Sequence, residues 1–326
     1  MAHSEEASKQ EVLVPSITIG IDVSKDHLDA ARYPGAGTLR VTNTRKGHSA
    51  LLRWIGDPAM VRRIVFEATG PYHRMLETRL AAAGLSIAKA NPRHARRFAE
   101  AIGRLAKTDR VDALMLARFG AVLEPTIRPV RTDLQNNLCE LVAARRALVR
   151  DRTATLNRLQ TQTIEILKRH ARHRLRQIAA QLVSVDTAIQ ALIDGDAVLS
   201  RRRQVLMSIP GLGAITVYAL LADMPELGSM EEGQAAALAG LAPMTQQSGK
   251  WSGRSAIRGG RAVLRQALYM PALVAMRFNP DLKRVYDRLT STGKHAKLAI
   301  TAVMRKLVVL ANALLRNDRV WTPKNA

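Results

Sequence analysis

Four acidic residues in the first part of the chain have the types and spacing for metal-assisted chemistry. Asp22 lies at the end of one β-branched apolar run, and Glu67 ends another. Asp109 and Asp112 stand three positions apart at the start of a predicted helix, so both project from nearly the same face. Mg²⁺ prefers such oxygen ligands, and two metals about 4 Å apart can stabilise the entering and leaving oxygens of phosphoryl transfer. The four carboxylates therefore predict a Mg²⁺ site, at which Mn²⁺ is a possible substitute.

The same acids also have a purely structural explanation. Asp109 follows Thr108 and could serve as a helix cap, while Asp112 could complement the dipole of the helix from its first turn. Under that explanation the chain is a non-enzymatic, basic nucleic-acid-binding or architectural protein. All four acids together, in this order and in a chain otherwise short of acids, favour the metal site over this structural explanation.

A second candidate segment combines glycines, hydroxyl groups and cations. Its serines are Ser248, Ser252 and Ser255, and its cations are Lys250, Arg254, Arg258 and Arg261. A flexible backbone with clustered cations suits close approach to a nucleic-acid phosphate. A serine attacks phosphorus only when its proton is removed or its oxygen is metal-bound, and no histidine adjoins these serines in the sequence. The residue types alone therefore predict a phosphate-binding loop before a catalytic serine.

The charge of the chain points to a polyanionic partner. Among 326 residues, 50 Lys and Arg stand against 27 Asp and Glu, which gives a formal net charge of +23. Residues 248–326 hold 16 of these cations and three acids. Charge of this size costs stability through self-repulsion, and a clustered basic surface is typical of nucleic-acid-binding proteins. We therefore expect DNA or RNA as the partner.

Composition excludes several other classes of protein. The single cysteine, Cys139, leaves no disulfide framework and no cysteine-based zinc module. The apolar run at residues 205–222 is broken early by Pro210, Gly211 and Gly213, whereas a membrane span needs about 20 predominantly apolar residues. A cytoplasmic protein associated with the nucleoid, without a membrane partner, is the resulting expectation.

The carboxylates fall in a predicted α/β domain at residues 16–128, preceded by a flexible tail at residues 1–15. Its predicted strands cover residues 16–23, 28–33, 38–42, 61–67 and 85–90, and its predicted helices cover residues 49–55, 72–83, a segment opening at Pro92, and 109–122. Three adjacent strands followed by alternating helix and strand is the order of an RNase H-like fold. In that topology the first and fourth strands are neighbours, which would place Asp22 beside Glu67.

The rest of the chain is predicted to be helical. Between Pro129 and Gly195 the chain contains no Pro and no Gly. The spacing of leucines in residues 129–199 predicts long helices, which form either an intramolecular hairpin or a dimerising coiled coil. Arg145 and Arg152 fall where apolar seam residues are expected. Residues 200–326 form a serine-bearing helical domain. Its start, SIPGLG at 208–213, is typical of a helix-hairpin-helix turn that offers backbone N–H groups to phosphate, or of a plain turn.

Several motifs in order along the chain resemble one family. They are GIDVSK at 20–25, FEATGPY at 66–72, NPRHARRFA at 91–99, KTDRVDA at 107–113, IPGLG at 209–213, GLAP at 240–243 and SGKWSGRSAIRGGRAVLRQALYMPAL at 248–273. The sequence resembles insertion-sequence transposases that combine a RuvC-like DEDD domain with a C-terminal serine domain and are guided by a bridge RNA. The resemblance extends from about residue 16 to residue 321.

The resemblance implies roles that the residue types alone leave open. It implies that Asp22, Glu67, Asp109 and Asp112 bind Mg²⁺ and that Ser248 becomes joined to DNA. It further implies donor and target DNA as substrates, a structured guide RNA, and a homo-oligomer, either a dimer or a tetramer. A RuvC-like nuclease or junction resolvase that uses water as the nucleophile remains the alternative enzyme.

Overall fold

The computed structural model describes residues 17–68, 70–103, 109–127, 129–245, 247–248, 251–253 and 255–323; the side chains of residues 109, 110, 248, 251 and 252 lie outside what it describes. The predicted tail at residues 1–15 and the predicted cationic positions Lys250 and Arg254 also lie outside the described residues. The chain divides into two compact units, Met1–Arg131 and Thr132–Ala326.

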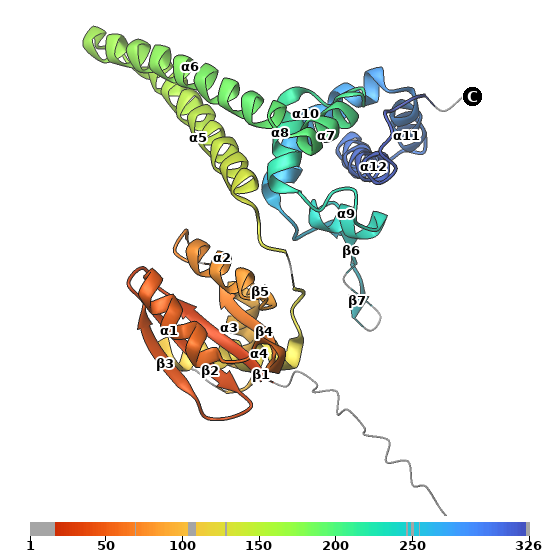
Figure 1. Ribbon diagram of the computed structural model, residues 1–326. Helices are drawn as coiled ribbons and strands as arrows, with labels where there is room; N and C mark the ends of the chain where they lie inside the picture. Colours follow the sequence, from red (N-terminus) through yellow and green to blue (C-terminus); the bar gives the residue numbers. More distant parts are fainter. Residues whose placement is uncertain are drawn as a thin grey trace, which may run out of the picture. The chain divides into compact units, whose positions relative to one another are not determined.

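The first unit is built on a five-stranded mixed sheet (Figure 1). Its strands are β1 (Ile17–Val23), β2 (His27–Tyr33), β3 (Thr38–Thr42), β4 (Val61–Glu67) and β5 (Ile87–Ala90). They lie in the order β3-β2-β1-β4-β5. The first three pair antiparallel, whereas β1–β4 and β4–β5 pair parallel. The predicted α/β class and the predicted neighbourhood of the first and fourth strands are both confirmed.

Helices cover the two faces of this sheet. They are α1 (Arg45–Ile55), α2 (Arg74–Ala82), α3 (Pro92–Ala101) and α4 (Asp109–Leu123), with a 3₁₀ turn at Pro58–Met60. On one face, Leu51 of α1 and Leu76 of α2 share a buried core with Phe66 of β4. On the other face, Leu116 and Phe119 of α4 pack with Val65. The sheet is thus buried on both sides, as its apolar strands require.

The helix boundaries differ from the predicted ones where local capping decides them. Helix α1 begins at Arg45 rather than at residue 49, because the Thr44 side chain accepts a hydrogen bond from the backbone N–H of Gly47. Helix α3 begins at Pro92 as predicted, with the Asn91 side chain as its cap.

The second unit begins with a long helical hairpin. Helix α5 (Asp133–Thr161) opens with a capping box formed by Thr132 and Gln135. Helix α6 (Glu165–Asp194) then runs back along it (Figure 1). Arg145 occupies the seam because its guanidinium forms an ion pair with Asp186 of α6, with an Nε–Oδ1 distance of 2.6 Å. Of the two predicted arrangements, the helices adopt the intramolecular hairpin.

The remaining helices surround one apolar core. They are α7 (Ala197–Met207), α8 (Ala214–Asp223), α9 (Glu232–Leu238), α10 (Ala262–Phe278), α11 (Pro280–Ser291) and α12 (Ala296–Arg316). The predicted turn at 208–213 joins α7 to α8. A Cβ atom on Gly211 would lie 2.7 Å from the Ala275 Cβ of α10, so this glycine allows close helix packing. Phosphate binding at this turn stays a prediction.

Among the residues that the structure describes, helix α12, rather than residues 205–222, has the length and composition that would suit a membrane span. Half of its apolar window is buried inside the protein, and Val303, Leu307 and Ala311 belong to the core of the second unit. Its apolar character is therefore explained by packing against α10 and α11.

Candidate active site

The ends of β1 and β4 bring two of the predicted carboxylates to one place. The parallel register pairs Ile21 with Phe66, and the next residues along the two strands are Asp22 and Glu67. Both side chains are half-buried. Adjacent parallel strands lie about 4.8 Å apart, so the two residues are neighbours at the same edge of the sheet. This is the arrangement that favours a metal site over isolated structural acids.

Helix α4 lies across the same face of the sheet as these carboxylates. A Cβ atom on Gly20 would lie 2.0 Å from the carbonyl oxygen of Ala113, so the helix backbone rests directly on β1. Side chains two positions apart in a strand share a face, and Asp22 therefore lies on the α4 side. Likewise, Val65 faces Gly120 of α4, which places Glu67 on that side too.

The two carboxylates of α4 lie at the beginning of that helix. Asp109 is its first residue, and Asp112 directly precedes the Ala113 that contacts β1. The structure thus brings Asp22, Glu67 and the first turn of α4 to one edge and one face of the sheet. Within the part of the chain that the structure describes, no three His, Cys, Asp or Glu side chains form a metal-binding group. The side chain of Asp109 lies outside the described residues.

The donor chemistry of this edge suits a hard divalent cation. Each of the four predicted ligands offers only carboxylate oxygens, which Mg²⁺ and Mn²⁺ prefer over nitrogen or sulfur. Asp22, Glu67 and Asp112 are half-buried, so their side chains remain partly accessible at this edge of the sheet.

Sequence reasoning missed a side chain that ties together the loops after the two strands. The Nδ2 atom of Asn43 donates hydrogen bonds to the Ser24 carbonyl at 2.8 Å and to the Tyr72 carbonyl at 3.1 Å. Ser24 follows Asp22 by two residues, and Tyr72 lies in the segment after Glu67. One carboxamide therefore fixes the spacing of the chain segments that carry the two carboxylates.

The buried ring of His48 orients this carboxamide. His48 Nε2 lies 2.8 Å from Asn43 Oδ1. Because Asn43 Nδ2 is the donor to both carbonyls, its oxygen must accept, and His48 is a neutral ring protonated at Nε2. Burial, and secondly the charge of Arg79, lower the pKa of His48 and favour this neutral form. No single-sequence signal joins residues 24, 43, 48 and 72, because their spacing follows no period.

A further charged cluster occupies the opposite face of the sheet. The Lys89 ammonium lies 2.8 Å from Oε1 of buried Glu77, and His73 Nε2 lies 3.6 Å from Oε2 of the same carboxylate. The His73 ring packs on Phe66 with a centroid distance of 5.6 Å. The cluster holds α2 against β4 and β5 on the side away from α4. A lysine in the middle of an apolar strand was the signal for it in the sequence.

The predicted serine lies in a small β-hairpin of the second unit. Strands β6 (Pro243–Met244) and β9 (Ala256–Ile257) pair antiparallel in one two-stranded sheet, and β7 (Gln247–Ser248) pairs antiparallel with β8 (Trp251–Ser252) in a second. Ser248 is opposite Trp251 in this register. Ser255 is engaged differently, since its Oγ lies 3.2 Å from the Thr245 Oγ1 across the ribbon. We call residues 243–257 the serine hairpin.

Close backbone contacts hold the base of the serine hairpin. A Cβ atom on Gly260 would lie 2.2 Å from the backbone nitrogen of Gly240, and both glycines have positive φ. The guanidinium of Arg265 donates to the carbonyls of Gly240 and Gly259 at 3.2 and 3.1 Å. Three glycines and one arginine thus fix the position of the base of the serine hairpin relative to the adjoining helices.

The predicted cations of this segment have different surroundings. Arg258 is exposed. Arg261 forms two hydrogen bonds to the carboxylate of Glu226, at 2.6 and 2.8 Å, and a third to the carbonyl of Asp223. Its guanidinium therefore anchors the start of α10, and Arg258 is the freer candidate for a phosphate contact.

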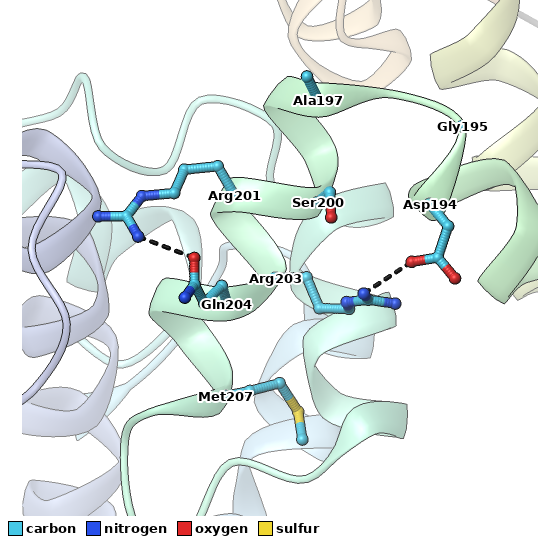
Figure 2. A pocket seen from close by; sticks show the side chains of 8 residues that line it. All are labelled: Asp194, Gly195, Ala197, Ser200, Arg201, Arg203, Gln204 and Met207. Carbon is cyan, nitrogen blue, oxygen red and sulfur yellow. Dashed lines mark hydrogen bonds and ion pairs between the residues drawn. The ribbon is translucent and has the colours of Figure 1, made fainter.

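A hollow at the junction of α6 and α7 shows that other arginines are also engaged (Figure 2). Arg203 lies 2.7 Å from the carboxylate of Asp194, and Arg201 donates to Gln204 at 2.8 Å. Arg201 also pairs with Asp318 at 2.7 Å. The cations that line this hollow are satisfied within the protein, so it is a poorer candidate for binding phosphate than the serine hairpin.

Two family models match the chain. One, for a DEDD transposase of the IS110 type, matches residues 19–170, and one described as "Transposase IS116/IS110/IS902 family" matches residues 203–287. The first match contains all four predicted metal ligands and the second contains Ser248.

Several curated proteins are similar to this chain. The "Pilin gene-inverting protein" of Moraxella bovis is 30% identical over 314 residues, which cover 92% of this chain and 96% of that protein. Its counterpart in Moraxella lacunata shows the same identity and coverage. An "Insertion element IS900 uncharacterized 42 kDa protein" of Mycobacterium paratuberculosis is 33% identical over 156 residues, 45% of this chain and 38% of that protein.

Proposed function

Because the chain belongs to the IS116/IS110/IS902 family of transposases and is therefore a DNA-recombining enzyme, we propose that it cuts and rejoins DNA by metal-dependent phosphoryl transfer through a covalent link to Ser248. The observation that carries this proposal is the pairing of β1 with β4, which makes Asp22 and Glu67 neighbours beneath the first turns of α4. An RNase H-like assignment of the first unit accords with the same strand order.

In this proposal Asp22, Glu67, Asp109 and Asp112 hold Mg²⁺. A cation held by these carboxylates would supply positive charge that stabilises the phosphoryl oxygens and the entering and leaving oxygens. The protein contributes the spacing of the carboxylates through the β1–β4 register and through the Asn43 hydrogen bonds to the two following loops. The contact of Gly20 with α4 sets the height of the helix above the sheet.

Ser248 is the nucleophile in this proposal. Its hydroxyl oxygen forms a bond to the phosphorus of a DNA phosphodiester, and the bond from that phosphorus to one deoxyribose oxygen breaks. The departing oxygen leaves with a proton, which balances the proton lost by the serine. Attack by the hydroxyl of another DNA end then reverses the step, joins the new strand and frees Ser248. The phosphoserine link retains the phosphodiester energy between cutting and rejoining.

The recognition of DNA sequence is proposed to rest on a structured guide RNA that pairs with donor and target DNA. The support is the resemblance of motifs along the chain together with the surplus of cations, which suits sequence-independent contacts to nucleic-acid backbones. Donor and target must be held together, so a homo-oligomeric enzyme that works in the cytoplasm at the nucleoid is part of the proposal.

Trapping the covalent link tests the chemistry. The purified enzyme would be incubated with guide RNA, donor and target DNA and Mg²⁺, then denatured, digested and analysed by mass spectrometry. We expect one DNA adduct, on Ser248, which Ser248→Ala abolishes and Ser252→Ala and Ser255→Ala retain. Strand cleavage that persists in Ser248→Ala would instead indicate a nuclease that uses water, and an adduct on another residue would refute the assignment.

Mixing two inactive variants tests how subunits share the reaction. We expect Asp22→Ala and Ser248→Ala proteins, each inactive alone, to regain some strand exchange when mixed, if the serine of one subunit works with the carboxylates of another. Failure at every mixing ratio would restrict the reaction to residues of one subunit. Omission of RNA from the same assay tests guidance, since RNA-independent exchange at the correct site would contradict it.

A further inference from the structure

The hairpin of α5 and α6 is strongly polarised in charge along its length. Its distal half, residues 150–177, holds eight Lys and Arg against two acids. Its proximal half, residues 133–149 and 178–194, holds two arginines against four acids. The distal half contains the turn between the helices and extends away from the other helices of the second unit (Figure 1). We call residues 150–177 the distal arm.

The cations of the two halves have different uses. In the proximal half, Arg145 pairs with Asp186, and Arg146 pairs with Asp223 of α8. Both arginines therefore serve the fold. In the distal arm the two acids are each paired, Glu165 with Arg172 at 2.7 Å and Asp151 with Arg174 at 3.7 Å.

Four arginines of the distal arm remain for an outside partner. Arg150, Arg152, Arg169 and Arg176 are exposed and form no ion pair with any residue that the structure describes. Packing does not require them, since the seam between the helices is made by other residues, among them buried Ala171 and Ile178. Like charges at this density oppose folding of the hairpin. The distal arm carries this excess positive charge although it lowers folding stability, which indicates that the arm binds a polyanionic ligand.

We propose that the distal arm binds the phosphate backbone of duplex DNA, as a surface separate from the serine hairpin; this inference rests on the proposed function as an enzyme that acts on DNA. Each helix with its side chains is about 10–12 Å wide, so two side by side are too wide for the major groove, which is about 12 Å across. The arm therefore contacts phosphates rather than base edges. Residues 150–161 of α5 extend over about 18 Å, enough to face about five phosphates of one strand. Arginine suits phosphate because its planar fork donates two parallel hydrogen bonds.

Binding by the full-length chain tests this inference. Fluorescence anisotropy would measure the Kd for a labelled 40-base-pair duplex of arbitrary sequence between 50 and 200 mM KCl, without Mg²⁺. The distal variant carries Arg150→Gln, Arg152→Gln, Arg169→Gln and Arg176→Gln. If all four cations contact phosphate, the slope of log Kd against log salt falls by about 3.6. Raising the salt fourfold would then weaken DNA binding by the variant about 150-fold less than binding by the wild-type protein.

A charge-relocation variant is the matched control. It combines the four distal changes with Asn137→Lys, Ala143→Lys, Gln181→Lys and Ser184→Lys, all at exposed positions of the proximal half. Its net charge equals that of the wild-type protein, so we expect it to bind as weakly as the distal variant. Recovery of wild-type DNA affinity would show that only the total charge matters and would refute DNA binding by the distal arm.

Other outcomes would also overturn the inference. A folded RNA with the same number of phosphates serves as competitor, and a loss confined to RNA would assign the arm to RNA instead. A changed oligomeric state in sedimentation with unchanged DNA affinity would assign it to assembly. Failure of the proposed chemistry is separately visible, because it would abolish the Ser248 adduct without altering these Kd values. Circular dichroism would verify that each variant keeps its helices.

Discussion

Gly20 of β1 and Ala113 of α4 are in direct backbone contact, so closely that a methyl group on Gly20 would lie 2.0 Å from the Ala113 carbonyl oxygen. Two residues beyond Gly20 is Asp22, and one residue before Ala113 is Asp112. This contact therefore sets the distance between the carboxylates of the sheet and those of the helix. Glycine at this position serves the candidate metal site as much as the fold.

Gly20→Ala should move α4 away from the sheet. The added methyl group meets backbone atoms, which cannot turn aside as a flexible side chain would, and we expect a loss of about 1–3 kcal/mol in unfolding free energy. Strand exchange should fall more steeply than stability, because the carboxylates would separate. Thermal unfolding and the Ser248 adduct assay provide the two readouts. Gly233→Ala in α9 is the control, since no atom of the described residues lies within 4 Å of its added methyl group. Equal effects of both changes would contradict the role of the contact between Gly20 and Ala113.

Asn43→Ala should weaken Mn²⁺ binding at the proposed site without removing any of the proposed metal ligands. The substitution leaves the Ser24 and Tyr72 carbonyls without their common donor, so the loops after Asp22 and Glu67 lose their fixed spacing. Residues that orient metal ligands typically contribute 10–100-fold in affinity. We expect electron paramagnetic resonance titration with Mn²⁺ to show a Kd raised within that range. Exposed Asn137→Ala is the control, and an unchanged Mn²⁺ Kd in Asn43→Ala would show that the carboxamide serves folding alone.

The sequence predicts the structure best where apolar residues recur at the regular spacing of a strand or a helix. The β-branched runs that contain Asp22 and Glu67 predict two buried strands, and strand order then predicts that the two acids are neighbours, as they are. The heptad-like leucines predict long helices, but a hairpin and a dimer share that pattern. The choice depends on contacts such as Arg145 with Asp186, 41 residues apart.

Features whose residues have no regular spacing in the sequence could not be predicted. The strands of the serine hairpin are two residues long, too short for any alternation of apolar and polar residues to appear. The residue types of this segment therefore predict a phosphate-binding loop but no strands. A glycine within a strand signals close approach but not the partner, which for Gly20 lies more than 90 positions away. Charge counts likewise overstate the cations available to DNA, because Arg261 binds Glu226 within the protein.

Gly260→Ala should separate covalent chemistry from DNA binding. Its methyl group would lie 2.2 Å from the Gly240 nitrogen, at a backbone angle φ of +62° that disfavours alanine, so the base of the serine hairpin must rearrange. We expect the rate of Ser248 adduct formation to fall at least about 100-fold, as misplacement by about 1 Å can cause, while the Kd for duplex DNA changes little. Gly293 has a similar φ of +75°, and within the described part of the chain no atom lies within 4 Å of a methyl group added there, so Gly293→Ala controls for backbone strain. Equal adduct yields in the two variants would refute a positioning role for the base.

Stability should fall as pH falls, through His48 and His73. Burial lowers the pKa of both rings, aided by Arg79 for His48 and by Lys89 for His73, whereas Glu77 opposes the shift in His73. In the unfolded chain each histidine takes up a proton near its ordinary pKa of about 6.5, while the folded form resists protonation until lower pH. The unfolded state then binds more protons, so the folded state loses stability as pH falls below about 6.5 and keeps it above that value.

Urea unfolding at pH 7.5 and pH 5.5 measures this dependence. We expect His48→Gln and His73→Gln each to lower stability at pH 7.5 but to reduce the further loss on acidification, since a titrating group is gone. His94→Gln removes an exposed histidine of α3 as the control and should leave the pH dependence as in the wild-type protein. If His48→Gln keeps the full acid-induced loss, the neutral ring that donates to Asn43 is not a source of that loss, and the hydrogen-bonded pair must tolerate protonation.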